Sequence, residues 1–222
     1  MAWEWNMSST CVLIGDIRSS RHLEDWPTVF GNLEEALREA NSAFADDVVV
    51  DFVPTVGDEF QGALRDARNA YAVYLQIKGG LPAAIYCGIG IGDVEKLRGS
   101  DVGMRGTAFY RARDALELCK GRKRNVTVRS SEQGGLTDET LNTLLHFIQS
   151  LEDSWTGRQR EVLGYYRLHP DHTYEQLGNH FGIARQSIRD IVSAGDWDLI
   201  VEGETLVKKW LESMMAHRKA EG

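Results

Sequence analysis

The sequence predicts a mixed α/β (α+β) domain with an antiparallel sheet, followed by a small all-α domain. Short apolar runs alternate with amphipathic helical periods up to about residue 130. A polar, glycine-containing break follows at 130–135, and every periodic segment after it is helical. A chain of 222 residues is long enough for two compact units. We therefore expect one domain at 1–132 and a second at 133–222.

The first half of the predicted domain contains three strands and one helix. Residues 9–15 form an apolar run rich in β-formers that ends on Asp16, which indicates a buried strand. Residues 26–44 carry apolar side chains at helical spacing, with charged side chains between them. Two further apolar runs, 48–54 and 59–64, flank a short connection and predict a hairpin.

The second half continues the alternation of helices and strands. Residues 66–78 and 107–119 are helical by composition, whereas residues 83–94 and 125–130 are rich in β-formers. The resulting order, βαββαβαβ, contains the split βαβ ferredoxin-like arrangement. This arrangement predicts an antiparallel sheet with its helices on one face.

Glycines alternate along the strand predicted at 83–94. Gly88, Gly90 and Gly92 all face one side of that strand, which favours close packing of a helix or backbone over a dinucleotide site. The sequence has no GxGxxG, no phosphate-binding GK[ST] loop and no HExxH. Apart from His169 and His172, which lie beside Pro170 in an apparent turn, its histidines also lack metal-ligand spacing.

Three acidic residues carry the strongest chemical signal. Asp16 ends the first strand, while Asp58 and Glu59 lie at the tip of the hairpin. Neighbouring strands would bring these carboxylates together, and Mg²⁺ or Mn²⁺ needs few protein carboxylates because water and phosphate complete its coordination. Alternatively these acids have only structural roles: Asp16 would be a helix cap or turn residue, and Asp58 and Glu59 would be common residues of a hairpin turn.

A polar loop follows Asp16 and is a candidate for phosphate binding. Its residues are Arg18, Ser19, Ser20 and Arg21, which offer hydroxyls, backbone amides and guanidinium groups. Gly57 allows the backbone geometry of the tight hairpin turn and is a further candidate cofactor-binding residue. The loop could equally be a solvated connection.

Four ordered motifs resemble the SatD family. They are GDIRSSR at 15–21, VGDEFQG at 56–62, CGIGIGDV at 87–94 and GTAFYRARDAL at 106–116. The same motifs are more distantly similar to class III nucleotidyl cyclases and to the palm domains of diguanylate cyclases. The resemblance to cyclases implies two metal-binding aspartates at Asp16 and Asp58, a nucleotide ligand and a homodimer.

The sequence departs from the cyclase pattern at three positions. Pro54 stands where those cyclases carry a lysine that selects the base, and proline has no hydrogen to donate. Tyr110 and Asp114 stand where they carry an asparagine and an arginine. Nearby Arg111 and Arg113 are candidate catalytic residues, because guanidinium groups bind phosphate. These departures rank binding above catalysis and leave enzymatic activity open.

The second domain resembles a winged or sigma-factor-like helix-turn-helix. A connector helix at 137–155 precedes helical segments at 156–170, 173–183 and 184–197. Gly182 lies at the turn, and the expected core is Leu177, Phe181, Ile183, Ile188 and Ile191 or Val192. The candidate DNA-binding residues are Arg185, Gln186, Ser187 and Arg189.

Charge argues against strong DNA binding by this domain alone. From Ser150 onward the chain has 12 acidic and 9 basic residues, giving −3, and the whole chain carries −8. An interaction domain that binds no DNA is therefore the alternative. An amphipathic last helix suits dimerisation, through Leu206, Val207, Trp210, Leu211 and Met214.

Composition sets the expected compartment. No run is long and apolar enough to cross a bilayer, the chain starts without a secretory signal pattern, and Cys11, Cys87 and Cys119 lie inside apolar or helical runs. We expect a cytoplasmic protein without a membrane partner. Three hypotheses remain open: a ligand-responsive DNA-binding regulator, a Mg²⁺-dependent nucleotidyl cyclase or transferase, and a catalytically silent scaffold.

Overall fold

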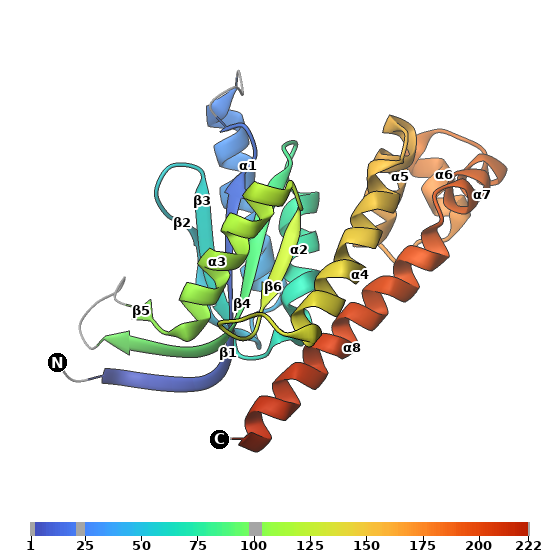
Figure 1. Ribbon diagram of the computed structural model, residues 1–222. Helices are drawn as coiled ribbons and strands as arrows, with labels where there is room; N and C mark the ends of the chain where they lie inside the picture. The colour runs from blue at the N-terminus through green and yellow to red at the C-terminus, as the bar shows by residue number, and fades with distance from the viewer. Residues whose placement is uncertain (1–2, 21–24, 98–103, 222) are drawn as a thin grey trace.

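The computed structural model describes residues 3–20, 25–97 and 104–221. Within these ranges the chain forms a mixed sheet surrounded by helices (Figure 1). The strands are β1 (Trp3–Ile17), β2 (Val48–Pro54), β3 (Glu59–Leu64), β4 (Ile85–Leu97), β5 (Met104–Arg105) and β6 (Val126–Arg129). The helices are α1 (Trp26–Ala43), the 3₁₀ helix η2 (Ala67–Asn69), α2 (Ala70–Gly79), α3 (Thr107–Arg122), α4 (Leu136–Asp153), α5 (Gly157–Leu168), α6 (Tyr174–Phe181), α7 (Arg185–Ala194) and α8 (Trp197–Glu221).

The sheet has six strands in the order β2-β3-β1-β4-β5, with β6 also paired to β4. The β4–β6 pair is parallel and the other pairs are antiparallel. The mixed α/β class and the predicted order of strands and helices are confirmed, with β5 as an additional short strand. Asp16 is the register partner of Glu59 on β3 and of Tyr86 on β4.

Helices cover both faces of the sheet, so the prediction that all helices lie on one face is wrong. Figure 1 shows α3 in front of the sheet and α1 and α2 behind it. On the α3 face Val12 and Ile14 of β1 pack with Ala112 and Leu116 of α3. The glycines of β4 allow α3 to pack closely on this face, because a Cβ at Gly90 would lie 2.1 Å from the carbonyl oxygen of Ala108. A helix backbone therefore rests directly on β4, which confirms the close packing expected there.

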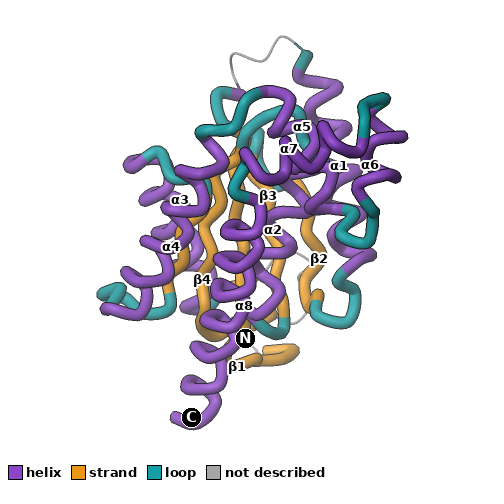
Figure 2. The backbone as a smooth tube through the Cα atoms, turned by 90° about the vertical axis from the view of Figure 1, so that its right-hand side faces the viewer, coloured by secondary structure: helices purple, strands orange, loops and turns teal. Residues whose placement is uncertain are grey.

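The opposite face carries the larger core. Leu13 of β1 and Ile89 of β4 pack there with Leu33 of α1 and Ile77 of α2. The same cluster continues into the C-terminal helices as far as Met215, so one apolar core spans the predicted boundary between residues 132 and 133. Helix α8 packs against α4, η2 and β1, and it lies in front of the sheet in the view of Figure 2.

An asparagine side chain pairs with the main chain of an outer strand at each side of the sheet. Asn41 of α1 accepts a hydrogen bond from the Phe52 amide at 2.8 Å and donates one to its carbonyl at 3.0 Å. Asn142 of α4 does the same to Val128 of β6, at 2.7 and 2.9 Å. Each side-chain amide thus takes the place of a neighbouring strand.

Helices α6 and α7 are joined by a short turn at 182–184. Gly182 ends α6 with φ +65°, a left-handed conformation that glycine adopts without strain. Thr173 and Gln176 form a capping box at the start of α6. Leu177, Ile188 and Val192 are buried, and Phe181, Ile183 and Ile191 pack against them, as expected for the core of this unit. Among the described helices, none has the length and apolar character needed to cross a membrane.

Candidate functional site

The three predicted metal-binding acids lie together at one end of the sheet. Asp16 and Glu59 are register partners on the adjacent strands β1 and β3. The amide of Ile17 donates to the carbonyl of Asp58 at 3.2 Å, which holds the hairpin tip against the end of β1. The sheet therefore brings carboxylates from two segments, 42 residues apart in sequence for Asp16 and Asp58, into one cluster.

Lys120 of α3 extends into this cluster. Its ammonium nitrogen lies 2.7 Å from a carboxylate oxygen of Asp16 and 3.7 Å from one of Glu59. Burial raises the pKa of Asp16 above its ordinary 3.8; Lys120 opposes that shift, whereas Asp58 and Glu59 reinforce it. Burial lowers the pKa of Lys120, but the Asp16 carboxylate, together with Glu117 and Glu59, outweighs burial and the net pKa is raised.

Glu59 and Asp58 have separate partners. Arg113 of α3 donates from one nitrogen to both carboxylate oxygens of Glu59, at 2.7 and 2.8 Å. The hydroxyl of Ser20 donates to a carboxylate oxygen of Asp58. A predicted catalytic arginine and a predicted phosphate-loop serine thus lie at the acids. We call Asp16, Asp58, Glu59, Arg113 and Lys120 the acid cluster.

Sequence reasoning identified Arg113 but missed Lys120. The two residues are seven positions apart on α3, so two helical turns place both on one face. That spacing was the available signal, but a lysine in the last turn of a helix also fits ordinary helix electrostatics. Nothing local in the sequence therefore separated Lys120 from a solvated lysine.

The predicted phosphate loop divides between two places. Ser20 lies at Asp58, whereas the Arg18 side chain turns to Asn125, donating to its side-chain oxygen at 3.0 Å, and stands 4.6 Å from the centre of the Tyr86 ring. Ser19 is exposed and has φ +56°. The prediction for Arg21 lies outside the described residues.

The hairpin turn and the start of α3 give the remaining predicted positions. Gly57 has φ +73° and a Cβ there would meet no atom within 4 Å, so its left-handed conformation explains the glycine. Arg111 donates to the carbonyl of Ile91 at 2.7 Å and does not share Arg113's partner. Tyr110 and Asp114, where cyclases carry an asparagine and an arginine, are both exposed.

The donor chemistry fits a hard divalent cation in part. Carboxylate oxygens are the ligands that Mg²⁺ prefers, and one or two can suffice when phosphate completes the coordination. Lys120 already places a positive charge against Asp16. Within the described part of the chain, no group of three or more His, Cys, Asp or Glu side chains has the geometry to hold a metal. Asp16 or Asp58 would therefore supply only a minority of the ligands.

Comparison with known families agrees with the motifs. The SatD family model matches residues 10–190, which includes the whole sheet apart from the start of β1. This chain belongs to the SatD family. The predicted family is thereby confirmed, and no functionally curated protein matches this SatD family protein.

Several solved structures are similar to parts of this SatD family protein. A bacterial light-regulated adenylyl cyclase overlaps 56% of this chain and 76% of its own, at 15% identity and a TM-score of 0.43. An EAL/GGDEF domain protein from M. capsulatus overlaps 59% and 90%, at 18% identity and 0.40. A regulator of polyketide synthase expression from Bifidobacterium adolescentis overlaps 95% and 86%, at 12% identity and 0.27. At these TM-scores the overlaps carry no inference about activity.

The predicted DNA-binding residues lie together on α7. Arg185, Gln186, Ser187 and Arg189 are all exposed, and they lie in the first half of the helix after the Gly182 turn. Gln186 donates to Asp190 at 2.9 Å, which places one acid beside them. The acid cluster and these residues belong to different parts of the fold, and DNA binding stays a prediction.

Proposed function

We propose that this SatD family protein is a regulator that binds a phosphate ligand together with a divalent cation at the acid cluster, and that this binding changes how α7 engages DNA. One observation carries the first half of the proposal. Lys120 pairs with Asp16, a candidate cation ligand, and also with Glu59, and Arg113 pairs with Glu59 as well. Carboxylates that could bind a metal and cationic side chains that could bind a phosphate are therefore neighbours in one cluster.

The residues of the acid cluster have complementary tasks in this proposal. Asp16 and Asp58 would hold the cation, and when bound it would supply positive charge that stabilises a phosphate ligand. Lys120 leaves the Asp16 carboxylate and turns to the phosphate, and Arg113 exchanges Glu59 for a second phosphate oxygen. Ser20 remains the hydroxyl that orients Asp58. Binding is favoured over turnover because Tyr110 and Asp114 replace the polar pair implied by the cyclase resemblance.

Calorimetry tests the first half of the proposal. ATP and GTP are titrated with Mg²⁺ or Mn²⁺ into wild type and into the double variant Asp16→Asn/Asp58→Asn. We expect metal-dependent binding that weakens about tenfold or more in the double variant. Asp51→Asn is the matched control, because Asp51 is an exposed carboxylate on β2. Equal binding by wild type and the double variant would contradict the proposal. A cyclic nucleotide or free pyrophosphate in the same samples would instead indicate nucleotidyl transfer.

Salt dependence tests the second half of the proposal. Fluorescence anisotropy on duplex DNA gives the affinity at several salt concentrations, with and without ATP and Mg²⁺. Arg185→Ala/Arg189→Ala removes two candidate phosphate contacts, so we expect the log–log slope to fall by about 2. Lys208→Ala/Lys209→Ala on α8 is the charge-matched control. The same slope in both variants would favour a scaffold that binds no DNA through α7.

A further inference from the structure

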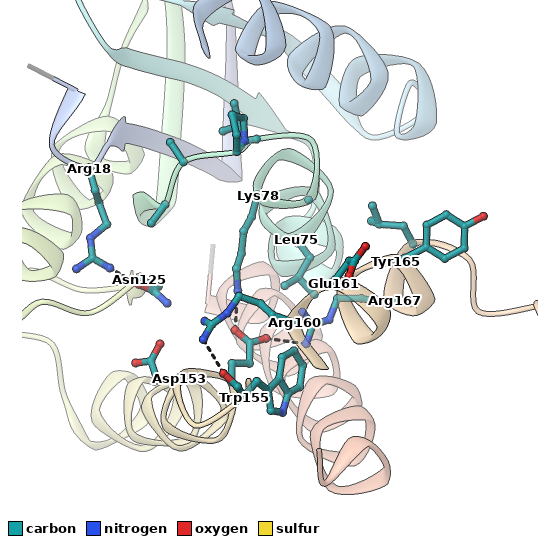
Figure 3. A pocket seen from close by; sticks show the side chains of 18 of the residues that line it. Arg18, Leu75, Lys78, Asn125, Asp153, Trp155, Arg160, Glu161, Tyr165 and Arg167 are labelled. Atoms are coloured by element: carbon teal, nitrogen blue, oxygen red, sulfur yellow. Dashed lines mark hydrogen bonds and ion pairs between the residues drawn. The ribbon is translucent and has the colours of Figure 1, made fainter. Parts of the chain in front are cut away.

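A cavity of about 820 Å³ lies at the junction between the sheet and the C-terminal helices. Its volume falls in the range of small-molecule sites in proteins. Arg18, Asn125 and the α2–β4 connection at 81–84 line it from the sheet side, and α5 and α6 line it from the other side. Figure 3 shows Arg18 and Asn125 on one side and Tyr165 and Glu161 on the other. We call this space the junction cavity.

The acids that line the junction cavity are already occupied. Glu152 pairs with Lys78 at 2.5 Å and with Arg167 at 2.6 Å, inside the wall. Glu161 pairs with Arg158 at 2.7 Å. The third acid, Asp153, accepts a hydrogen bond from Gln149 at 3.2 Å. Two of the three negative charges are therefore balanced by cations.

Two lining arginines bind only neutral acceptors. Arg18 donates to the side-chain oxygen of Asn125 at 3.0 Å, and Arg160 donates to the carbonyl of Trp155 at 2.8 Å. Neither has a carboxylate partner among the described residues. Each guanidinium has five donors, so most of the hydrogen-bonding capacity of both remains open to an anion. Figure 3 places Arg160 between the Arg18 side and the Tyr165 side of the cavity.

The side of the cavity formed by α5 has open space and an apolar surface. Gly164 lies in the interior of α5 and lines the cavity, and a Cβ there would meet no atom within 4 Å. Glycine inside a helix is unfavourable compared with alanine, and no packing contact in the described structure requires it here. Leu168, one helical turn further along α5, adds apolar surface beside it, whereas the Tyr165 ring already packs against the rings of His169, His180 and Phe181. This wall suits the ring of a ligand.

We propose that the junction cavity is a second binding site, which takes an organic anion with a ring, of about mononucleotide size, without a metal. The anionic group binds Arg18 and Arg160, and the ring lies against the wall formed by Gly164 and Leu168. This site goes beyond the function proposed above, because it uses none of the carboxylates of the acid cluster. Since Arg18 belongs to the sheet and Arg160 to α5, a bound ligand fixes α5–α7 relative to the sheet.

The test uses the fluorescent aryl sulfonate ANS as the probe, in EDTA. Gly164→Leu places a side chain in the cavity at the proposed ring position and favours the helix, so we expect a folded protein whose ANS affinity is about tenfold lower than wild type. Gly157→Leu is the matched control, because Gly157 lies in the same helix, also faces open space and does not line the cavity. Arg160→Gln is a second variant that keeps the cavity open, and we expect about fivefold weaker binding.

Competition identifies the source of the anion. Displacement of ANS by AMP indicates a nucleotide, and displacement by salicylate indicates an aromatic acid. Adenosine, which has the ring without the charge, should displace little. Equal ANS affinity in wild type, Gly164→Leu and Arg160→Gln, or displacement by none of the anions, overturns the proposal. Asp16→Asn/Asp58→Asn should bind ANS like wild type, so this site and the acid cluster can fail independently.

Discussion

The ammonium group of Lys120 lies 2.7 Å from the Asp16 carboxylate, although the two residues are 104 positions apart in the chain. The pair joins the end of the central strand β1 to the last turns of α3. Lysine therefore provides an internal cation at the place where the sequence predicts a metal. Competition between the Lys120 ammonium and a metal ion for Asp16 should therefore affect the pKa of Asp16 and the affinity for Mg²⁺.

Replacing Lys120 should change the titration of Asp16. In Lys120→Met the burial of Asp16 and the negative charges of Asp58 and Glu59 are no longer opposed, so the pKa of Asp16 should rise further. Carboxyl ¹³C NMR measures this directly, with the exposed Lys209→Met as control. A pKa of Asp16 that stays constant or falls would show that Lys120 does not occupy this position in solution. The same variant should bind Mg²⁺ more tightly, because no ammonium competes for the carboxylates.

The stability contributed by Asp16 should depend on pH with a definite sign. Its pKa in the folded protein lies above 3.8, so protonation favours folding and this contribution is complete below that value. It is lost as the pH rises through the folded pKa. Urea unfolding of wild type and Asp16→Asn between about pH 3 and pH 7 gives the difference. The advantage of wild type should decrease with rising pH, and an increase would contradict the prediction.

Glu152 should be a large contributor to stability. Burial pushes its pKa up, but Lys78 and Arg167 outweigh burial and hold the pKa below 4.5. Glu152→Gln leaves two cations without this carboxylate, and removing one partner of a buried pair costs about 3 kcal/mol of unfolding free energy. The control is Glu35→Gln, whose exposed pair with Arg38 should change stability far less, because water screens the two charges.

The contribution of Glu152 to the free energy of unfolding should also depend on pH. A lowered pKa means that the contribution of Glu152 is present above pH 4.5 and is lost as the pH falls through its folded pKa. The wild-type advantage over Glu152→Gln should therefore shrink in acid. Similar stability losses in Glu152→Gln and Glu35→Gln would contradict the importance of the buried pair.

Gly90 should tolerate no side chain. In Gly90→Ala the new Cβ would lie 2.1 Å from the Ala108 carbonyl and 2.3 Å from the Ala112 amide, so α3 must move off the sheet. We expect a loss of about 3 kcal/mol in unfolding free energy, measured by urea denaturation. Gly121→Ala, within α3 and facing open space, should instead stabilise by about 0.5 kcal/mol. A neutral Gly90→Ala would show that α3 packs more loosely than described.

Local patterns predicted the elements better than their arrangement. The hairpin strands 48–54 and 59–64 were predicted with the bounds that the structure has, because apolar runs and a glycine turn mark them. The first strand was expected at 9–15 and runs from Trp3 to Ile17, since its polar start lacks a continuous apolar run. Strand β5 is too short to leave a pattern. The side of the sheet on which α3 lies depends on the crossover after β4, which periodicity does not record.

The acids of the candidate site and Arg113 were predictable from the sequence, whereas Lys120 was not. Asp16 lies at the end of an apolar strand and Asp58 at the tip of the hairpin, so their position at one end of the sheet could be predicted from the sequence. The contact of Lys120 with Asp16 and the junction cavity form only when distant parts of the chain come together on folding. Arg18 and Arg160, which both line the cavity, are an example. The direction of the Arg18 side chain, away from Asp58 and toward Asn125, is likewise set by tertiary contacts.

The two asparagines at the sides of the sheet have a consequence for association between molecules. An outer strand with open amides and carbonyls is a template on which a strand of another chain can add, which leads to domain swapping and fibrils. Asn41 satisfies both main-chain groups of Phe52, and Asn142 satisfies both groups of Val128. An incoming strand must first break two hydrogen bonds at either side. The protein thereby has a built-in resistance to growth of its sheet into aggregates.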